Sequence, residues 1–269
     1  MLAKLAMRLK AISPALERAV MNRWYQAIAA WFQQPDWTFM NFGYAALDGQ
    51  PTAQLSPGEE PDRYGIQLYH HVAGAAGLAG KDVLEVGSGR GGGAAWLARK
   101  YRPCSLTGMD YSINAIRLCN RLHAHPGLRF RQGNAEAMPF PDESFDVVVN
   151  VESSHGYARV DRFLGEANRV LRPGGVLAWV DFRYAAQVAT LDRLFASSGF
   201  RPQHSLDITA NVLRSLDLVS EQRLGLINRL APRIVRGLLR EFAAVNGSES
   251  YRALATGRMV YLSRTLQKT

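Results

Sequence analysis

The feature that most constrains the fold is an alternation of apolar, β-rich runs with helical patterns after residue 81. The predicted strands are Asp82–Val86, Ser105–Asp110, Leu128–Gln132, Phe145–Asn150 and Val176–Phe182. Helical patterns lie between or after them, at about residues 92–101, 112–124, 159–171 and 186–198. Such alternation predicts an α/β fold with a parallel sheet covered by helices on both faces. The runs "FDVVVN" and "VLAWV" are almost continuously apolar, as expected of central parallel strands.

Both flanks of this region read as additions to one domain rather than as a second domain. Residues 1–36 carry apolar side chains at helical spacing, followed by the loop-rich "NFGYAALDGQPTAQLSPGEEPD" and a helix from Asp62 to about Ala76. After a further strand at Arg201–Thr209, residues 210–256 read as helices, and "RMVYLSRTL" as a final strand.

Composition and cysteine usage fit a soluble, reduced protein. The 269 residues are 47% hydrophobic and 20% charged, which is ordinary for a globular chain. No apolar run approaches the roughly 18 residues that span a bilayer, and charges interrupt the N-terminus, so we expect a cytoplasmic protein without a secretory leader. Cys104 and Cys119 belong to no metal-binding spacing, and adjacent His70 and His71 point about 100° apart on a helix. We therefore expect no metal, and one of these histidines exposed.

The net charge of +9 admits several partners. The main interpretation is a solvated basic surface. Nucleic-acid binding is disfavoured because the sequence has no stripe in which aromatic and basic residues are interleaved. The first 12 residues place an apolar stripe beside Lys4, Arg8 and Lys10. This stripe either packs on the protein itself, mediates a homodimer, or lies weakly on an anionic membrane.

The segment "VLEVGSGRGGG", from Val83 to Gly93, places a glycine turn between a strand and a helix. Gly87, Gly89 and Gly92 satisfy G-x-G-x-x-G, a weak signal by itself. Glu85 decides which kind of ligand this turn suits, because a carboxylate at this position would repel a pyrophosphate and attract a cation. S-adenosylmethionine carries both an ammonium and a sulfonium. Its amino-acid portion would lie against Gly87 and Gly89.

Polar residues after the next strands suit the rest of a nucleoside ligand. Asp110, at the end of the second strand, can accept hydrogen bonds from ribose hydroxyls, although an NAD enzyme would use the same position. Asn134 and the Ala135 backbone can bond adenine; alternatively, Asn134 is a turn residue. Tyr111 and Asn150 complete the expected cofactor contacts.

These motifs, with "GNAEAMPFPDESFDVVVN" and "VLRPGG", resemble the class I S-adenosylmethionine-dependent methyltransferases over about residues 80–182. Many members have aspartate where this chain has Asn134. The flanking "PDRYGIQLYHHV", "NVESSHGYARVDRFLGEANRVLRPGG" and "FAAVNGSESYRALATGRMVYLSRTLQK" resemble the O-methyltransferases of polyketide and glycolipid pathways, such as the phthiotriolone dimycocerosate methyltransferases. Gly156 stands where those proteins tend to carry cysteine.

The resemblance implies a doubly wound, Rossmann-like sheet of seven mostly parallel strands whose seventh strand is antiparallel. It implies a cofactor-binding core over residues 79–209. Residues 1–78 would form an N-terminal helical lid, and residues 210–269 a helical lid insertion and the final strand of the same domain. S-adenosyl-L-methionine is the implied cofactor, and a hydrophobic small molecule the implied acceptor.

Methyl transfer to a hydroxyl needs a base at the carboxyl ends of the strands. His155 in "NVESSHGY" is the predicted base, since histidine exchanges protons near neutral pH. Glu152 either orients His155, binds the cofactor's amino group, or is an acid at a helix start. Asp181 in "WVDFR" either pairs with His155, steadies the acceptor, or caps the next helix. Tyr44 either bonds the cofactor's carboxylate or is a packed tyrosine.

The alternatives left open are C- or N-methylation of a small molecule, an RNA methyltransferase, and a non-catalytic cofactor-binding partner of a synthase. The fold alone does not fix the acceptor.

Overall fold

The structure is a computed structural model of the chain, and it describes residues 37–269. The predicted helices, amphipathic stripe, membrane contact and dimer contact of residues 1–36 lie outside the described residues. Homodimerisation and cytoplasmic location stay predictions. None of the described helices is both long and apolar enough to cross a membrane.

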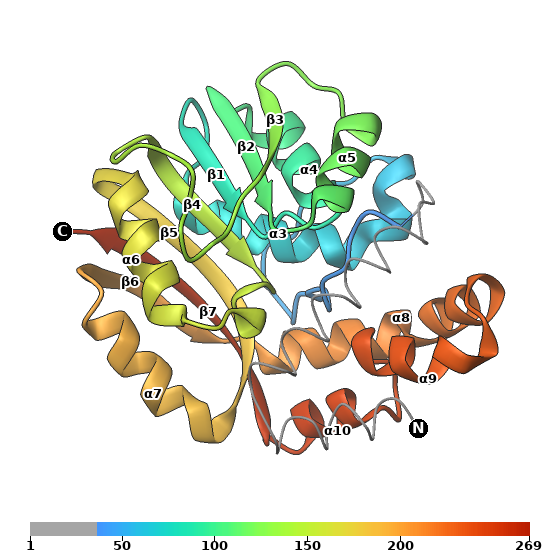
Figure 1. Cartoon of the computed structure of the whole chain (residues 1–269). Coiled ribbons are helices and arrows are strands. Elements are labelled where there is room, and N and C mark those ends of the chain that lie inside the picture. Colours follow the sequence, from blue (N-terminus) through green and yellow to red (C-terminus); the bar gives the residue numbers. More distant parts are fainter. Residues whose placement is uncertain (1–36) are drawn as a thin grey trace.

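One seven-stranded sheet forms the centre of the molecule, in the order β3-β2-β1-β4-β5-β7-β6 (Figure 1). Its strands are β1 Asp82–Val86, β2 Ser105–Asp110, β3 Leu128–Gln132, β4 Phe145–Val151, β5 Leu171–Tyr184, β6 Phe200–Asp207 and β7 Met259–Lys268. β1 to β5 pair in parallel, whereas β7 runs antiparallel to both β5 and β6. The predicted fold class, including the antiparallel seventh strand, is confirmed.

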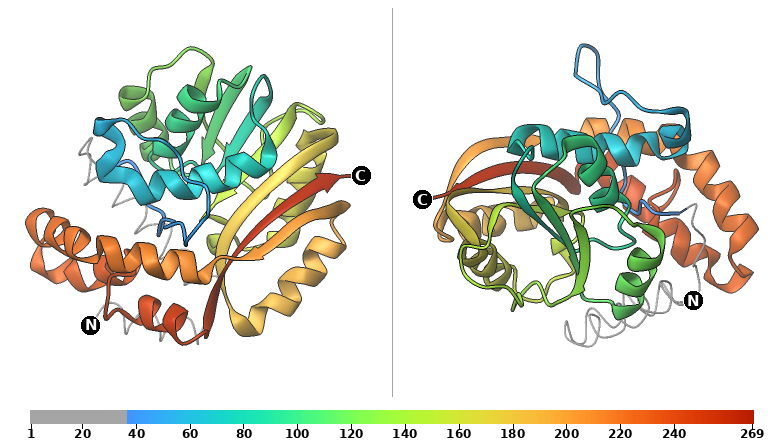
Figure 2. Two further views of the ribbon diagram at one scale, coloured as in Figure 1. Left: turned by 180° about the vertical axis from the view of Figure 1, so that it is seen from behind. Right: turned by 90° about the horizontal axis from the view of Figure 1, so that it is seen from above.

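Helices cover both faces of this sheet (Figure 2). The described helical elements are η1 Pro57–Asp62, α3 Arg63–Ala76, α4 Gly92–Tyr101, α5 Ile113–Leu122, η2 Ser154–Gly156, α6 Val160–Val170, α7 Ala185–Ala196, α8 Thr209–Leu230, α9 Arg233–Phe242 and α10 Glu249–Ala255. Successive residues of a strand serve opposite cores, as alternation requires. Val83 packs with α3 and α4 on one face, and Leu84 packs with α6 and α7 on the other.

The fifth strand starts earlier than predicted. We expected it to begin at Val176, after the "RPGG" turn, but Leu171 already pairs with Phe145 of β4. The register shifts before Val147 pairs with Val176, so the turn is taken up as an irregularity inside one long strand.

The helices between β6 and β7 leave the sheet. α8 packs its first half against β7, and its buried residues end at Ser220. The second half of α8 extends away from the sheet and carries α9 at its far end, as Figures 1 and 2 both show. A small cluster of Ala231, Val235 and Leu239, joined by Trp37, holds α9 on α8.

Candidate active site

The glycine turn after β1 is folded against the loop that follows β4. Gly87 has φ +80°, and its N–H donates to the Met109 carbonyl at 2.7 Å. A Cβ on Gly87 would lie 1.9 Å from the Ser153 Oγ atom, so no other residue fits without moving that loop. Gly91, with φ +79°, is the N-cap from which α4 begins. Because Gly87 and Gly91 have no side chains, the turn, the start of α4 and the Ser153 loop can pack closely together.

Glu85 is a buried carboxylate with one free oxygen. It is 0% exposed, and the Tyr69 hydroxyl donates to its Oε1 at 2.6 Å. Its Oε2 has no hydrogen-bond partner among the described residues. Burial raises the pKa of the Glu85 carboxyl to about 7, and the neighbouring charge of Asp110 adds to this; the Tyr69 hydroxyl and the nearby Ala94 backbone N–H oppose it. A cation beside Oε2 would relieve both the missing bond and the buried charge.

Asp110 stands at the end of β2, next to the same turn. Its Oδ2 accepts the Gly89 N–H at 2.9 Å, and its Oδ1 accepts the Ser112 N–H at 2.8 Å. Burial raises the pKa of the Asp110 carboxyl to about 6, and these two bonds only partly oppose the shift. Each oxygen keeps a lone pair for a further donor.

Asn150 joins the two sides of the turn. Its Nδ2 donates to the Val86 carbonyl at 2.8 Å and to the Tyr157 hydroxyl at 3.0 Å. Its Oδ1 is buried without a partner, as is the Ser88 Oγ in the turn itself. Buried polar atoms are rarely left unpaired. With Glu85, these atoms mark one place where a polar ligand would complete the hydrogen bonding.

The predicted adenine contacts lie in a turn after β3. Asn134 is exposed, and its Oδ1 accepts the Glu136 N–H at 2.9 Å, which is the alternative role of a turn residue. Ala135 beside it is buried, whereas Tyr111, after Asp110, is 59% exposed. The Tyr111 carbonyl accepts a bond from Gln132 at 3.2 Å. Adenine recognition by these residues stays a prediction.

His155 and Asp181 form a hydrogen-bonded pair at the ends of β4 and β5. The His155 Nδ1 lies 2.8 Å from the Asp181 Oδ1, and the His155 backbone N–H donates to Oδ2 at 2.8 Å. The His155 side chain is 38% exposed, whereas Asp181 is fully buried. The predicted pairing is thus confirmed. Asp181 does not cap the following helix, whose N-cap is Tyr184.

Asp181 is held ionised by a complete set of partners. Ser154 Oγ donates to its Oδ2 at 2.8 Å, and Arg183 forms an ion pair with it at 3.0 Å. Burial acts to raise the pKa of the Asp181 carboxyl, but the charges of His155 and Arg183 and the bonds from His155 and Ser154 hold it well below its ordinary value. Because the ionised carboxylate only accepts, Nδ1 of His155 is the donor of this pair, and Nε2 is the ring nitrogen that does not bond Asp181.

Glu152 does not orient His155 but bonds a strap in the N-terminal part of the described chain. The strap, residues 41–44, is fixed where Phe42 donates its N–H to the Glu152 Oε1 at 2.7 Å. The Tyr261 hydroxyl donates to the same oxygen. Burial raises the pKa of the Glu152 carboxyl to about 7, against the opposing bonds from Tyr261 and Phe42. Within residues 37–269, Glu152 makes no hydrogen bond to His155, and its backbone takes the left-handed φ of 43°.

One aromatic ring stacks on the His155 imidazole, and a second ring stacks on the first. The His155 ring stacks on Phe182 at 4.2 Å, and Phe182 stacks on Phe42 of the strap at 5.3 Å. An acceptor approaching Nε2 therefore meets an apolar flank.

Three tyrosine and histidine predictions have plainer outcomes. Tyr44 donates its hydroxyl to Gln50 at 2.8 Å and stacks on His71, and its predicted bond to the cofactor stays a prediction. His70 bonds the Tyr101 hydroxyl, and His71 bonds the Ser263 hydroxyl. Both histidines are partly buried, so the expectation that one is exposed is wrong.

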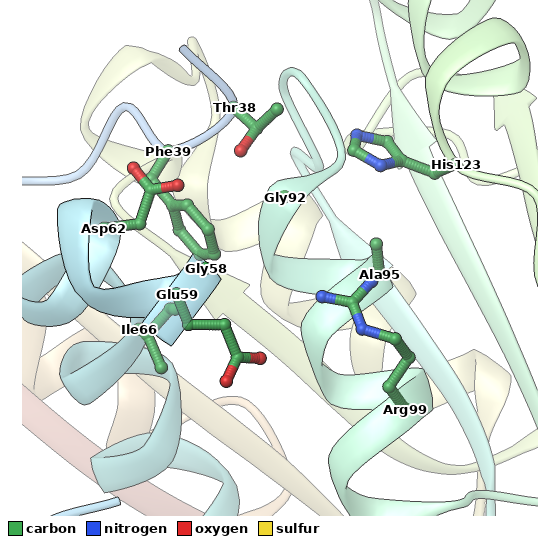
Figure 3. A pocket seen from close by; sticks show the side chains of 10 residues that line it. All are labelled: Thr38, Phe39, Gly58, Glu59, Asp62, Ile66, Gly92, Ala95, Arg99 and His123. Carbon is green, nitrogen blue, oxygen red and sulfur yellow. The ribbon is translucent and has the colours of Figure 1, made fainter. Parts of the chain in front are cut away.

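Two cavities of the described chain lie apart from these groups. Figure 3 shows one of about 150 Å³, in which Glu59 and Asp62 face Arg99 and His123 across the start of α4 at Gly92. The other, of about 290 Å³, lies between α3 and α8. Neither is lined by Glu85, Asp110 or His155, and the charged lining of the first does not suit an apolar acceptor.

Sequence reasoning missed the residues that hold the predicted ones in place. Tyr69, Ser154, Arg183 and Tyr261 each bond a predicted carboxylate. Ser154 and Arg183 lie in the quoted "NVESSHGY" and "WVDFR", close to His155 and Asp181, and so had a signal. For Tyr69 and Tyr261, only the folded packing reveals the contact.

Comparisons with known proteins agree on the kind of domain. A family model described as a methyltransferase domain matches residues 84–179. The phthiotriol/phenolphthiotriol dimycocerosates methyltransferase of Mycobacterium leprae is 39% identical over 247 residues, covering 92% of this chain and 91% of the relative. The fatty-acid O-methyltransferase of Mycolicibacterium smegmatis is 41% identical over 207 residues, covering 77% and 75%.

Solved structures share the fold at low sequence identity. A protein described as a sarcosine dimethylglycine methyltransferase from Galdieria sulphuraria aligns with a TM-score of 0.71 and 14% identity, covering 90% of this chain and 98% of its own. A cyclopropane synthase from Mycobacterium tuberculosis aligns with a TM-score of 0.67 and 16% identity, covering 90% and 97%.

Proposed function

The chain belongs to the class I S-adenosylmethionine-dependent methyltransferases, and we propose that within this family it methylates a hydroxyl oxygen of a lipid-like acceptor, with His155 as the general base. The observation that carries the proposal is the His155–Asp181 pair on a loop that touches the glycine turn.

S-adenosyl-L-methionine is the cofactor of this family, and the residues at the glycine turn fit it. The free Oε2 of buried Glu85 suits the ammonium group, and Asp110 has lone pairs for the ribose hydroxyls. Gly87 and Gly89 leave the backbone of the turn without side chains. When bound, the cofactor supplies a methyl group on a sulfonium, which needs no further activation.

The acceptor class rests on the relatives and on the surroundings of His155. One relative is named for dimycocerosates and another for fatty acids, both long-chain lipids. Phe182 and Phe42 give the His155 edge an apolar flank that suits such a chain. The lid formed by α8–α10 and the residues ahead of β1 stays part of this proposal.

The base assignment favours a hydroxyl over a carboxyl acceptor. An alcohol must lose its proton as its oxygen attacks the methyl carbon, and Nε2 of the partly exposed His155 side chain takes that proton. Asp181 then stabilises the resulting imidazolium, because its own negative charge is permanent under these conditions. A fatty acid is already ionised at neutral pH and needs no base.

The test is to incubate the enzyme with S-adenosylmethionine and matched long-chain acceptors bearing a hydroxyl, a carboxyl or an amine, and to detect the methylated products by mass. We expect the alcohol to be methylated and His155→Ala to abolish that product. Methylation of only the amine or only the carboxylate, with His155→Ala unimpaired, would refute the base and the hydroxyl acceptor together.

A further inference from the structure

We propose that the tip of the α8–α9 hairpin is a docking surface for an anionic lipid membrane. The tip surface consists of Arg229, Leu230, Arg233, Ile234, Arg236 and Arg240. The proposal stands on this surface itself and not on the proposed reaction.

The charge of the tip surface is uncompensated over a long stretch. Residues 222–240 contain five arginines and neither aspartate nor glutamate. Arg223, nearest the core, is partly buried and bonds carbonyls of the strap, so it does not belong to the tip surface. Arg229 and Arg233 are exposed, and no ion pair involves them within residues 37–269.

The remaining arginines of the tip surface bond only neutral groups. Arg236 donates to the Ala231 carbonyl at 2.9 Å and to the Asn228 carbonyl at 2.7 Å, at the end of α8. Arg240 reaches the Asn228 side chain at 3.4 Å. These bonds fix the direction of the guanidinium groups without cancelling their charge.

The acids that bracket the stretch do not neutralise it. Glu241 accepts the backbone N–H of Glu249 at 2.9 Å and of Ser250 at 3.2 Å, so it caps the start of α10. Glu221, directly ahead of the stretch on α8, is exposed and forms no ion pair with an arginine of the tip surface among the described residues. Asp217, further toward the core on α8, accepts the Tyr251 hydroxyl. The hairpin therefore presents a positive field at its outer end.

A large aliphatic side chain stands among these charges. Ile234 is 81% exposed, the highest value among the exposed large hydrophobic residues of the described chain. It does not belong to the cluster that joins the two helices, since Val235 and Leu239 supply that contact on the opposite face of α9. Leu230 beside it is only partly buried.

The shape and chemistry of the tip favour a lipid surface over other partners. The hairpin projects from the sheet (Figures 1 and 2), so Ile234 can enter a soft interface while the arginines reach phosphate groups. Sites for single-stranded nucleic acid use exposed aromatic rings on which the bases stack. Among the described residues, no exposed large aromatic residue lies on this hairpin. The sequence leading to Trp37, which packs on the hairpin, is also basic.

Vesicle flotation of the full-length protein tests the proposal. The protein should float with vesicles of phosphatidylcholine containing phosphatidylglycerol, should stay behind with phosphatidylcholine alone, and should be released by high salt, which screens charge. Arg229→Glu with Arg233→Glu should weaken binding by at least about tenfold. Ile234→Asp should also weaken it, because the aspartate removes the inserted group and adds a repelled charge.

Matched controls carry the same changes elsewhere. Arg117→Glu with Arg129→Glu, on exposed positions of α5 and β3, alters the net charge equally, and Leu206→Asp replaces an exposed leucine on β6. Both should float like the wild type.

Three results would overturn the proposal. The first is equal loss in the controls and the hairpin variants. The second is unchanged flotation of Ile234→Asp together with a lowered melting temperature, because Ile234 would then be covered by the chain itself. The third is no vesicle binding at all but binding of a purified acidic carrier protein that Arg233→Glu weakens, because the surface would then dock a protein.

Discussion

Glu85 and Asp181 are both fully buried carboxylates near the same edge of the sheet, yet their surroundings are opposite. Glu85 has one hydroxyl partner on Oε1 and none on Oε2, and its pKa is raised to about 7. Asp181 is bonded by Ser154, His155 and Arg183, and its pKa is held well below the ordinary value.

This difference separates binding from chemistry. A buried carboxylate with an unmet bond costs free energy until a ligand supplies the missing donor or charge. A buried carboxylate with every bond met has no need of a ligand and instead fixes its neighbour, here the imidazole of His155. The glycine-turn region is thus incomplete until the cofactor binds, whereas the His155 region is complete beforehand.

The largest effect is expected from removing the base. His155→Ala should lower turnover of a hydroxyl acceptor by roughly 10²–10⁴-fold, the range for a lost general base, while the Kd for S-adenosylmethionine stays unchanged. His204→Ala, at an exposed position of β6, is the matched control and should keep full turnover. Steady-state kinetics measure the turnover and calorimetry measures the cofactor affinity of both variants. A parallel loss of cofactor affinity in His155→Ala would show that the His155 region also contributes to cofactor binding.

Stability should respond oppositely to removing the two charges. Asp181→Asn leaves the buried Arg183 without its carboxylate, so the free energy of unfolding should fall by about 3–5 kcal/mol. Glu85→Gln removes an unpaired buried charge, so the cofactor-free protein should be unchanged or more stable. Urea denaturation at neutral pH measures both, and a larger loss in Glu85→Gln than in Asp181→Asn would reverse the comparison.

The pH dependence of the free energy of unfolding should also reveal the raised pKa of Glu85. Its raised pKa means that the folded protein keeps a proton which the unfolded chain releases, so the stabilisation is full below pH 4.5 and is lost as pH rises through about 7. A shift from 4.5 to about 7 corresponds to roughly 3 kcal/mol.

The free energy of unfolding without cofactor should therefore fall between about pH 5 and about pH 8. Glu85→Gln should lower this slope, leaving the larger part that is due to Asp110 and Glu152, whose pKa values are raised to about 6 and about 7. The same slope in Glu85→Gln and in the wild type would show that the pKa of the Glu85 carboxyl does not differ between the folded and the unfolded protein.

The sequence predicted the strands well because each is an apolar run bounded by polar or glycine residues. Five of the predicted helix and strand starts, at Asp82, Gly92, Ser105, Leu128 and Phe145, agree with the structure. The long β5 was shortened because "RPGG" has the composition of a turn, and only pairing with β4 shows that it belongs to the strand.

The candidate site was predictable where it depends on strand ends and not where it depends on packing across the sheet. Asp181 and His155 could be paired in advance because adjacent parallel strands end at one edge. The contact of Glu152 with Phe42 joins residues 110 positions apart, and no local pattern encodes it. Tyr44 has a position in the strap that sequence alone could not distinguish from a cofactor contact.

The claim that the glycine turn binds the cofactor while the His155 region performs the chemistry is tested most directly by calorimetry. The binding of S-adenosylmethionine is measured to the wild type, Glu85→Gln, Asp181→Asn and His155→Ala. Glu85→Gln loses a charge-assisted hydrogen bond to the ammonium group, so its affinity should fall by roughly 1–3 kcal/mol. Asp181→Asn and His155→Ala should bind the cofactor as the wild type does. Wild-type affinity in Glu85→Gln, with weakened binding in the other two variants, would contradict the account.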